Sequence, residues 1–297
     1  MARRDTVPNG FPRPSSPAAP ASPFLIFPVL FLTALLAGCG DGGGDKDVVS
    51  YVSDLRQDDF LQRLAAAKEL SLEAEEVDVV AVPYLIEALE EPREMIQRYS
   101  AQALGRIRAY TAIPALIKWS RRGGDYVRFD CVSALGKLDD PRVHPPLIEA
   151  LKDESSYVRW AASEGLGELG VVQAYPRLVT GLRDSSSYVR SASAKALGQI
   201  GDPAAIPHLK SSLYDRNLWV RNASAQALAR LGDQEGVPIL IKNLESDAQE
   251  RDELVREQAA EFLREATGEN FGFDPHGPAA DREEVIRRWQ NWWQNRR

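Results

Sequence analysis

Hydrophobic positions in the middle of the chain recur at the spacing of an amphipathic helix. Val127, Cys131, Ala134, Leu135 and Leu138 fall at i, i+4, i+7, i+8 and i+11, which places them on one stripe of a helix. Most positions between them are polar. A second kind of segment carries leucines four residues apart, as in Leu147 and Leu151, and is also typical of a helix.

The two kinds of segment alternate with a fixed period of 31 residues. Each period has a Val-Arg pair or its counterpart in one segment and a proline in the other. The prolines are Pro83, Pro114, Pro145, Pro176, Pro207 and Pro238. Proline suits the first turn of a helix, where its missing N–H needs no partner. Each period therefore predicts two antiparallel helices, which we call the proline helix and the Val-Arg helix.

This period predicts an all-α fold of stacked units that bury their apolar faces against one another. We expect a right-handed α-α superhelix of about seven helix pairs over residues 48–266. The first unit lacks the proline: Tyr51 and Leu55 replace its leucines, and its second helix should start near Gln62. After Thr267 the period stops, and residues 267–297 should form a C-terminal cap.

The repeated proline and the Val-Arg segment that ends in Leu-Gly resemble the HEAT repeat. More narrowly, they are similar to the short 31-residue type found in phycobilisome lyase subunits. The resemblance implies a solenoid whose Val-Arg helices line a concave face. It also implies protein binding as the usual function, with a lyase-like accessory role for a chromophore or prosthetic group as the alternative.

Residues that are constant between units are interpreted as serving the stacking. The arginines of the Val-Arg pairs should pair with Asp153, Asp184 and Asp215 in the turns, with a ligand-binding ladder as the alternative. An aromatic residue precedes each pair and is interpreted as core support rather than as a binding strip. These aromatic residues are Tyr126, Tyr157, Tyr188 and Trp219.

Residues that vary between units on the outward stripe of the Val-Arg helices are the candidates for protein binding. They are Arg98, Gln102, Phe129, Lys137, Trp160, Glu164, Lys195 and Gln226. Phe129 and Trp160 should lie side by side, because they occupy the same position in adjacent units. Exposed aromatic residues surrounded by charge are common hot spots of protein interfaces. The alternative is that one or both tuck under a neighbouring helix.

The first 38 residues differ from the rest and predict a secretory signal. Basic residues come first, and the apolar run 24–36 is too short to span a bilayer. The run ends in Leu36-Ala37-Gly38-Cys39, which resembles the lipobox of bacterial lipoproteins. The resemblance implies cleavage before Cys39 and acylation of its thiol, and residues 39–47 then form a flexible glycine-rich tether. The alternatives are an uncleaved anchor or a start codon placed too far upstream.

These features predict a protein of the cell envelope, held by its lipid on the periplasmic or extracellular face. Gly40 stands where some Gram-negative lipoproteins carry the aspartate of inner-membrane retention, so the outer membrane is favoured. The net charge is −7, and removing residues 1–38 takes away three basic and one acidic side chain, which leaves −9. This balance argues against a nucleic-acid partner. The second cysteine, Cys131, has no partner for a disulfide once Cys39 is acylated.

No catalytic arrangement is visible in the sequence. The three histidines are His144, His208 and His276; the first two flank repeating prolines, and no acidic residue stands with them at metal-ligand spacing. The chain also lacks a phosphate-binding loop and a serine elbow. We therefore expect no enzyme activity, no cofactor and no metal, and a monomer that acts as a scaffold for protein partners. A purely architectural protein is a third reading.

The C-terminal segment is rich in tryptophan. Ile286, Trp289, Trp292 and Trp293 share one face of a helix expected from about Asp281. This helix either covers the open edge of the last repeat or offers a docking patch to a partner or a bilayer surface.

Overall fold

Pairs of short helices follow one another along the chain in the computed structural model. It describes residues 51, 54–55, 60–72, 81–245 and 250–296, all within one unit that spans Lys46–Arg297. Every regular element in these residues is helical. The signal and the tether expected at residues 1–47 lie outside the described residues. The prediction of an all-α repeat fold is confirmed.

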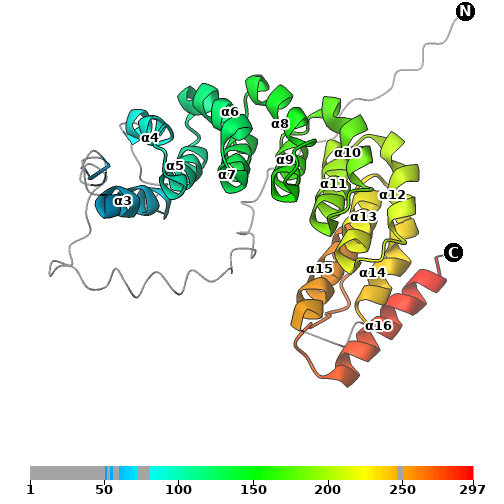
Figure 1. The fold of residues 1–297 in the computed structure, drawn as a ribbon. Helices are drawn as coiled ribbons and strands as arrows, with labels where there is room; N and C mark the ends of the chain where they lie inside the picture. The colour runs from blue at the N-terminus through cyan, green and yellow to red at the C-terminus, as the bar shows by residue number, and fades with distance from the viewer. Residues whose placement is uncertain (1–50, 52–53, 56–59, 73–80, 246–249, 297) are drawn as a thin grey trace, which may run out of the picture. The chain divides into compact units, whose positions relative to one another are not determined.

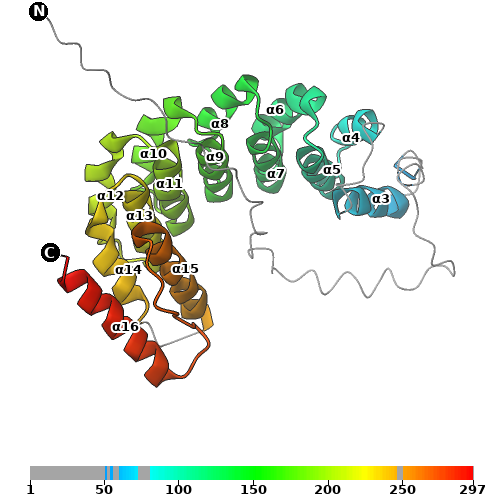
Figure 2. The same cartoon turned by 180° about the vertical axis from the view of Figure 1, so that it is seen from behind.

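Two rows of helices run side by side (Figures 1 and 2). The proline helices are α4 (Val82–Ala88), α6 (Ile113–Arg122), α8 (His144–Ala150), α10 (Tyr175–Gly181), α12 (Ile206–Ser212) and α14 (Val237–Asn243). The Val-Arg helices are α5 (Glu94–Arg106), α7 (Asp125–Gly136), α9 (Ser156–Glu168), α11 (Ser187–Ile200), α13 (Leu218–Arg230) and α15 (Glu250–Thr267). Helix α3 (Phe60–Leu72) packs on α5 as the second helix of the first unit, and it starts two residues before the expected Gln62.

Each repeating proline occupies the second position of its helix, as predicted. A single 3-10 turn, which the sequence pattern did not predict, precedes five of these helices. These turns are η3 (Tyr110–Ala112), η4 (Pro141–Val143), η5 (Val172–Ala174), η6 (Pro203–Ala205) and η7 (Gln234–Gly236). The backbone reverses just before η5, η6 and η7 through Gly170, Gly201 and Gly232, whose φ angles are positive. The 3-10 turn then leads directly into the proline helix.

The glycine that follows the repeated leucine lets successive Val-Arg helices touch backbone to backbone. A Cβ atom on Gly136 of α7 would lie 2.8 Å from the Cα of Gly165 on α9, and one on Gly198 of α11 would lie 2.7 Å from the Cα of Ala227 on α13. Gly105 faces Ala134 and Gly167 faces Ala196 in the same way. Because the obstructing atoms belong to backbone, a larger residue there cannot be accommodated by a side-chain rotation. These contacts set the separation of the repeats.

We expect Gly136→Ala to destabilise the protein. Helix propensity alone would favour the change by up to about 1 kcal/mol, but overpacking a dense contact costs about 1–3 kcal/mol. A net loss in urea unfolding, larger again in Gly136→Val, is therefore the expected result. Ser133→Ala, on the same helix with a half-buried side chain, is the control and should change stability by less than about 0.5 kcal/mol. A stabilised Gly136→Ala protein would show that the helices can separate freely.

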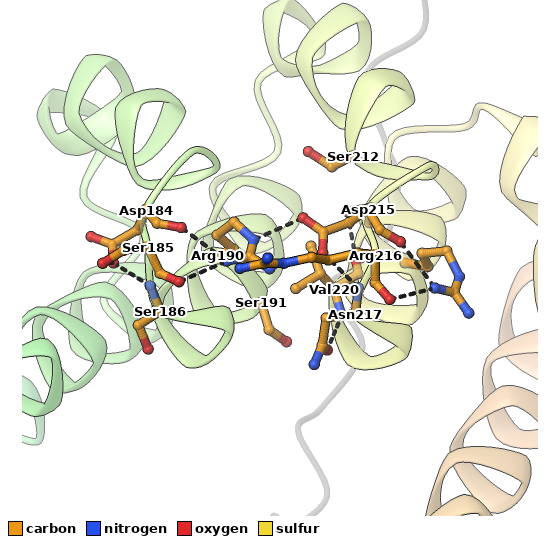
Figure 3. A network of polar contacts seen from close by, with 12 residues as sticks. Asp184, Ser185, Ser186, Arg190, Ser191, Ser212, Asp215, Arg216, Asn217 and Val220 are labelled. Atoms are coloured by element: carbon orange, nitrogen blue, oxygen red, sulfur yellow. Dashed lines mark hydrogen bonds and ion pairs between the residues drawn. The ribbon is translucent and has the colours of Figure 1, made fainter.

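Arginines and aspartates join the turns of consecutive units, which confirms the structural interpretation of the arginine series (Figure 3). The guanidinium of Arg190 donates from Nε and Nη2 to Asp215 at 2.7 and 2.9 Å, and from Nη1 to the carbonyl of Asp184 at 2.9 Å. Arg159, one unit earlier, makes the same bidentate contact with Asp184, and Arg128, two units earlier, makes it with Asp153. Each arginine therefore ties its own turn to the next one.

The same aspartates hold the turns that precede the Val-Arg helices. Asp184 Oδ1 accepts a hydrogen bond from the backbone N–H of Ser186 at 2.8 Å, and no serine side chain caps α11. Arg159 fixes the carboxylate of Asp184 beside this turn. Burial disfavours the charged form of Asp184, but the hydrogen bonds from Arg159 and Ser186 outweigh it and keep its pKa below the usual value.

The last helix, α16 (Ala279–Gln294), closes the C-terminal end of the array. It packs on α14, and Gln290 donates a hydrogen bond to Glu245 at 2.9 Å. Trp289 is 1% exposed, and Phe271 contacts its ring edge to face with centroids 4.6 Å apart. The helix begins two residues before the expected Asp281. Of the two roles considered, this packing supports the covering of the final repeat.

Candidate protein-binding face

Five aromatic side chains from three successive Val-Arg helices form a continuous row, which we call the aromatic row. It consists of Tyr126 and Phe129 on α7, Tyr157 and Trp160 on α9, and Tyr188 on α11. Phe129 and Trp160 are stacked, with ring centroids 5.8 Å apart and planes inclined by 19°. The other neighbouring rings have centroid distances of 6.1 to 6.5 Å. Phe129 and Trp160 thus lie side by side, as predicted.

The tyrosines of the row are not core residues. Tyr126, Tyr157 and Tyr188 are 50, 49 and 63% exposed, whereas Phe129 and Trp160 are partly buried. The interpretation of the tyrosines as core support is therefore wrong. They precede the buried valine of each helix, so their rings lean on the aromatic residues of the adjacent unit instead of entering the stack. Contiguous exposed aromatic surface of this kind often marks an interaction site.

A buried carboxylate fixes the α5 end of the aromatic row. Arg98 of α5 lies 4.9 Å above the ring of Tyr126, and its Nε donates to Asp130 at 2.7 Å. Gln102 donates to the second oxygen of Asp130 at 2.9 Å. Asp130 is 3% exposed, and this burial raises its pKa despite the two hydrogen bonds. The network holds the Arg98 guanidinium against the row by both an ion pair and a cation–π contact.

Asp130 did not emerge from the sequence analysis, although the sequence contains a signal for it. The equivalent positions of the next three units are Ala161, Ala192 and Ala223. An acidic residue at a position that is a buried alanine in the next three units is not needed for stacking. Comparing the units with one another could therefore have identified it as specific to this part of the face.

Charged residues border the aromatic row toward the C-terminal ends of the helices. Arg106 is the last residue of α5 and Lys137 directly follows α7, whereas Glu168 on α9 brings the opposite charge. Shielding from water, together with the charge of Arg106, lowers the pKa of Lys137. Burial raises the pKa of Glu164, and the nearby charge of Lys195 on α11 offsets part of this increase. Charges therefore alternate along this border, with basic residues at α5 and α7, acidic residues on α9 and Lys195 on α11.

The structure brings together most of the predicted site residues. Arg98, Gln102, Phe129 and Trp160 belong to the aromatic row and its Asp130 network, and Lys137, Glu164 and Lys195 lie on the same helical face. The prediction of Gln226 on α13 as a binding residue is corrected, because its side chain is only 8% exposed and cannot offer a solvent-facing contact. Helix α15 packs against α13 and closes this part of the face. Asn222, one turn earlier on α13, is likewise buried and hydrogen-bonded to Asn243.

Two further observations concern the chemistry of the described residues. Among them, no three or more histidine, cysteine, aspartate or glutamate side chains are grouped as a metal ion would require. Within the same ranges, no helix combines the length and hydropathy that a membrane crossing needs. Cys131 is buried as a free thiol in α7.

Comparisons with known proteins agree on the fold. The model of HEAT repeats matches residues 82–156 and 144–229, and the model of the PBS lyase HEAT-like repeat matches residues 220–246. A comparison with curated proteins finds no match.

Two solved structures illustrate the similarity. The structure of the complex of CpcE and CpcF of phycocyanin lyase from Nostoc sp. PCC7120 is 22% identical, covers 85% of this chain and 97% of its own, and gives a TM-score of 0.54. YibA from Escherichia coli is 18% identical, covers 75% of this chain and 82% of its own, and gives a TM-score of 0.51. At these identities the likeness concerns the fold. The paired helices, the 31-residue period and the matching repeat models together show that this chain is a HEAT-repeat protein of the short, phycobilisome-lyase-like type.

Proposed function

We propose that this protein is a scaffold that binds a protein partner through the face of α5, α7, α9 and α11. The aromatic row carries the proposal. Three of its rings are 49 to 63% exposed, so the stacking of the helices does not bury them. Tyrosine and tryptophan supply large contact areas with few rotatable bonds, which is why they dominate interface hot spots.

The surroundings of the row support the same function. Arg98 is held rigidly by Asp130, so little side-chain entropy would be lost when a partner contacts it. The glycine contacts and the arginine–aspartate pairs fix the separation of the three helices that carry the rings. The row is therefore a preorganised surface rather than a set of independent side chains.

Loss of the central rings should abolish partner capture. We expect the tagged Phe129→Ala/Trp160→Ala protein to lose specific partners that the unmodified protein retains from detergent-solubilised envelopes, as measured by quantitative mass spectrometry. Tyr214→Ala is the matched control, because Tyr214 is aromatic and 84% exposed but follows α12 and lines a surface hollow with Trp293 of α16 and with no residue of the row. Identical partner lists for all three proteins would contradict the proposal.

We also propose that Cys39 carries a lipid that anchors this scaffold to the bacterial envelope. Support comes from the basic start, the apolar run and the lipobox-like residues 36–39 of the sequence. Residues 39–47 are rich in glycine and aspartate, a composition that suits the expected tether between the lipid and the repeat array. In this arrangement the scaffold concentrates its partner near the membrane.

The lipid is tested by the two cysteines of the chain. Cells grown with radiolabelled palmitate should label the protein and its Cys131→Ala variant, whereas Cys39→Ser should remain unlabelled and leave the membrane fraction. Alanine is a suitable replacement at Cys131, because the equivalent residue of the next unit is Ala162. Label on the Cys39→Ser protein, or none on the unmodified protein, would overturn the anchor.

A lyase-like accessory role is the second candidate, favoured by the similarity to the phycocyanin lyase structure. The stacked Phe129 and Trp160 rings offer a flat surface on which a planar conjugated group could lie. After mixing with a linear tetrapyrrole, the protein should retain visible absorbance through gel filtration, and Phe129→Ala/Trp160→Ala should not.

A further inference from the structure

Trp160 carries the one indole ring of the aromatic row, and Glu164 lies one turn later on the same helix, α9. Residues four positions apart are neighbours on the surface of a helix. The two side chains form a hydrogen bond, in which the indole N–H donates to the carboxylate. A hydrogen bond to an ionised acceptor is stronger than one between neutral groups, so it can hold the ring in a defined orientation.

The other units from α5 to α13 show that this pair of residues is specific to α9. The residues equivalent to Trp160 in those units are Arg98, Phe129, Ser191 and Asn222. The residues equivalent to Glu164 are Gln102, Ser133, Lys195 and Gln226. The unit with an indole at the first position is therefore the one with a carboxylate at the second. Since the other units stack without an acid at this position, stacking does not account for Glu164.

The charged groups around Glu164 do not replace this bond. Lys195 on α11 and Glu168 on α9 act on Glu164 through their charges, and Lys137, which directly follows α7, acts on Glu168 in the same way. Among the described residues, no lysine or arginine forms a direct ion pair with Glu164. The indole of Trp160 is therefore the direct partner of its carboxylate.

We propose that Glu164 is a positioning residue of the aromatic row, which holds the indole of Trp160 stacked on Phe129 before a partner binds. The two rings have centroids 5.8 Å apart and planes inclined by 19°, and Tyr188 of the next unit contacts the indole as well. Without the bond, the partly buried indole would sample several side-chain orientations. Ordering it would then reduce the affinity for the partner. This inference rests on the proposed protein-binding function and adds the residue that prepares its central ring.

The orientation of Trp160 can be followed in the full chain by fluorine NMR after labelling with fluorotryptophan. Trp160→Phe identifies the resonance of Trp160 among those of the six tryptophans. We expect one narrow Trp160 resonance in the unmodified protein and in Glu164→Gln, whose amide oxygen still accepts the N–H. Glu164→Ala should broaden or split this resonance. Glu168→Gln is the matched control, because it removes an acidic charge one turn later on α9 and leaves the indole bond in place.

The pH dependence of the Trp160 resonance separates a direct bond from a general loosening of the face. Burial raises the pKa of Glu164 above the usual value of a glutamate, so the resonance should shift as the pH falls through this raised pKa. Lys195 favours the charged carboxylate and Glu168 disfavours it. Lys195→Met should therefore move the midpoint of the shift to higher pH, and Glu168→Gln should move it to lower pH. Glu164→Gln should abolish the shift, because an amide does not titrate in this range.

Partner capture from envelopes connects the orientation of Trp160 to binding. Glu164→Ala should retain about two- to tenfold less of the specific partners than the unmodified protein, which is the range expected when binding must order one more side chain. Glu164→Gln should retain them as the unmodified protein does, because it keeps the acceptor for the indole.

Two results would overturn the inference. One is a Trp160 resonance that is insensitive to pH and as narrow in Glu164→Ala as in the unmodified protein. The other is full partner capture by Glu164→Ala while Phe129→Ala/Trp160→Ala captures none. The proposed function stands in either case as long as the double variant loses its partners. Partner lists unchanged by the double variant would instead remove the function itself.

Discussion

Replacing Trp289 by alanine should lower the free energy of unfolding by about 3–5 kcal/mol, the usual cost of removing a fully buried tryptophan. Trp289 is 1% exposed, and its ring is in edge-to-face contact with Phe271 and Trp292. Alanine would leave a cavity between the last repeat and α16. Because each repeat in such an array is stabilised by its neighbours, the loss should begin at this end.

Two measurements check the role of Trp289. Chemical denaturation should show the loss of stability, and hydrogen exchange should show faster opening of α14–α16 than of α7–α11. Trp292→Ala is the matched control. Because Trp292 is only partly buried, this variant should lose clearly less free energy of unfolding than Trp289→Ala. A Trp289→Ala protein as stable as Trp292→Ala would mean that α16 does not seal the array.

Replacing Arg190 by methionine should cost about 3 kcal/mol, because it removes one partner of a largely buried ion pair. Arg190 is 6% exposed as a residue, and its loss leaves the Asp215 carboxylate and the carbonyls of Asp184 and Ser185 without their donor. The pair joins two consecutive turns, so both should loosen (Figure 3).

The pH dependence of stability separates this effect from simple packing loss. Burial disfavours the charged form of Asp215, but hydrogen bonds from Arg190 and the backbone of Asn217 prevail and hold its pKa below the usual value. A carboxyl with a lowered folded pKa stabilises the protein above its unfolded pKa of about 3.9 and loses this contribution as the pH falls further. Arg190→Met should therefore show a smaller loss of stability than the unmodified protein between pH 5 and pH 2.

The surface pair Arg142–Asp140 provides the control for Arg190. It has a similar N–O distance of 2.7 Å, but the Arg142 side chain is 58% exposed. Water replaces such a contact readily, so Arg142→Met should leave the melting temperature nearly unchanged. If the two variants were equally stable, the arginine series would not hold the turns together.

The repeat architecture could be predicted because it depends on interactions within one unit and between adjacent units. The helical stripe that includes Val127 and Leu135, and the proline at the second position of each proline helix, depend on residues within one unit or the next. The pairing of Arg128 with Asp153 follows from the same period. The adjacency of Phe129 and Trp160 was equally predictable, since both occupy one position of the repeat.

The details of the candidate face depended on contacts that the period does not encode. Tyr157 proved to be about half exposed and not a core residue, because its ring packs on Phe129 of the preceding unit. Trp160 packs beside Tyr188 of the next unit in the same way. Gln226 proved buried because α15, which departs from the regular spacing, packs against α13.

The sequence by itself determined that the chain stacks paired helices, which residues repeat for the stacking, and which positions vary. Only the tertiary structure decided which variable side chains reach solvent and which of them meet, as in the Arg98–Asp130 ion pair across α5 and α7. The physical reason is that helix formation and stacking are set by periodic local patterns, whereas the exposure of a side chain depends on every element that packs over it.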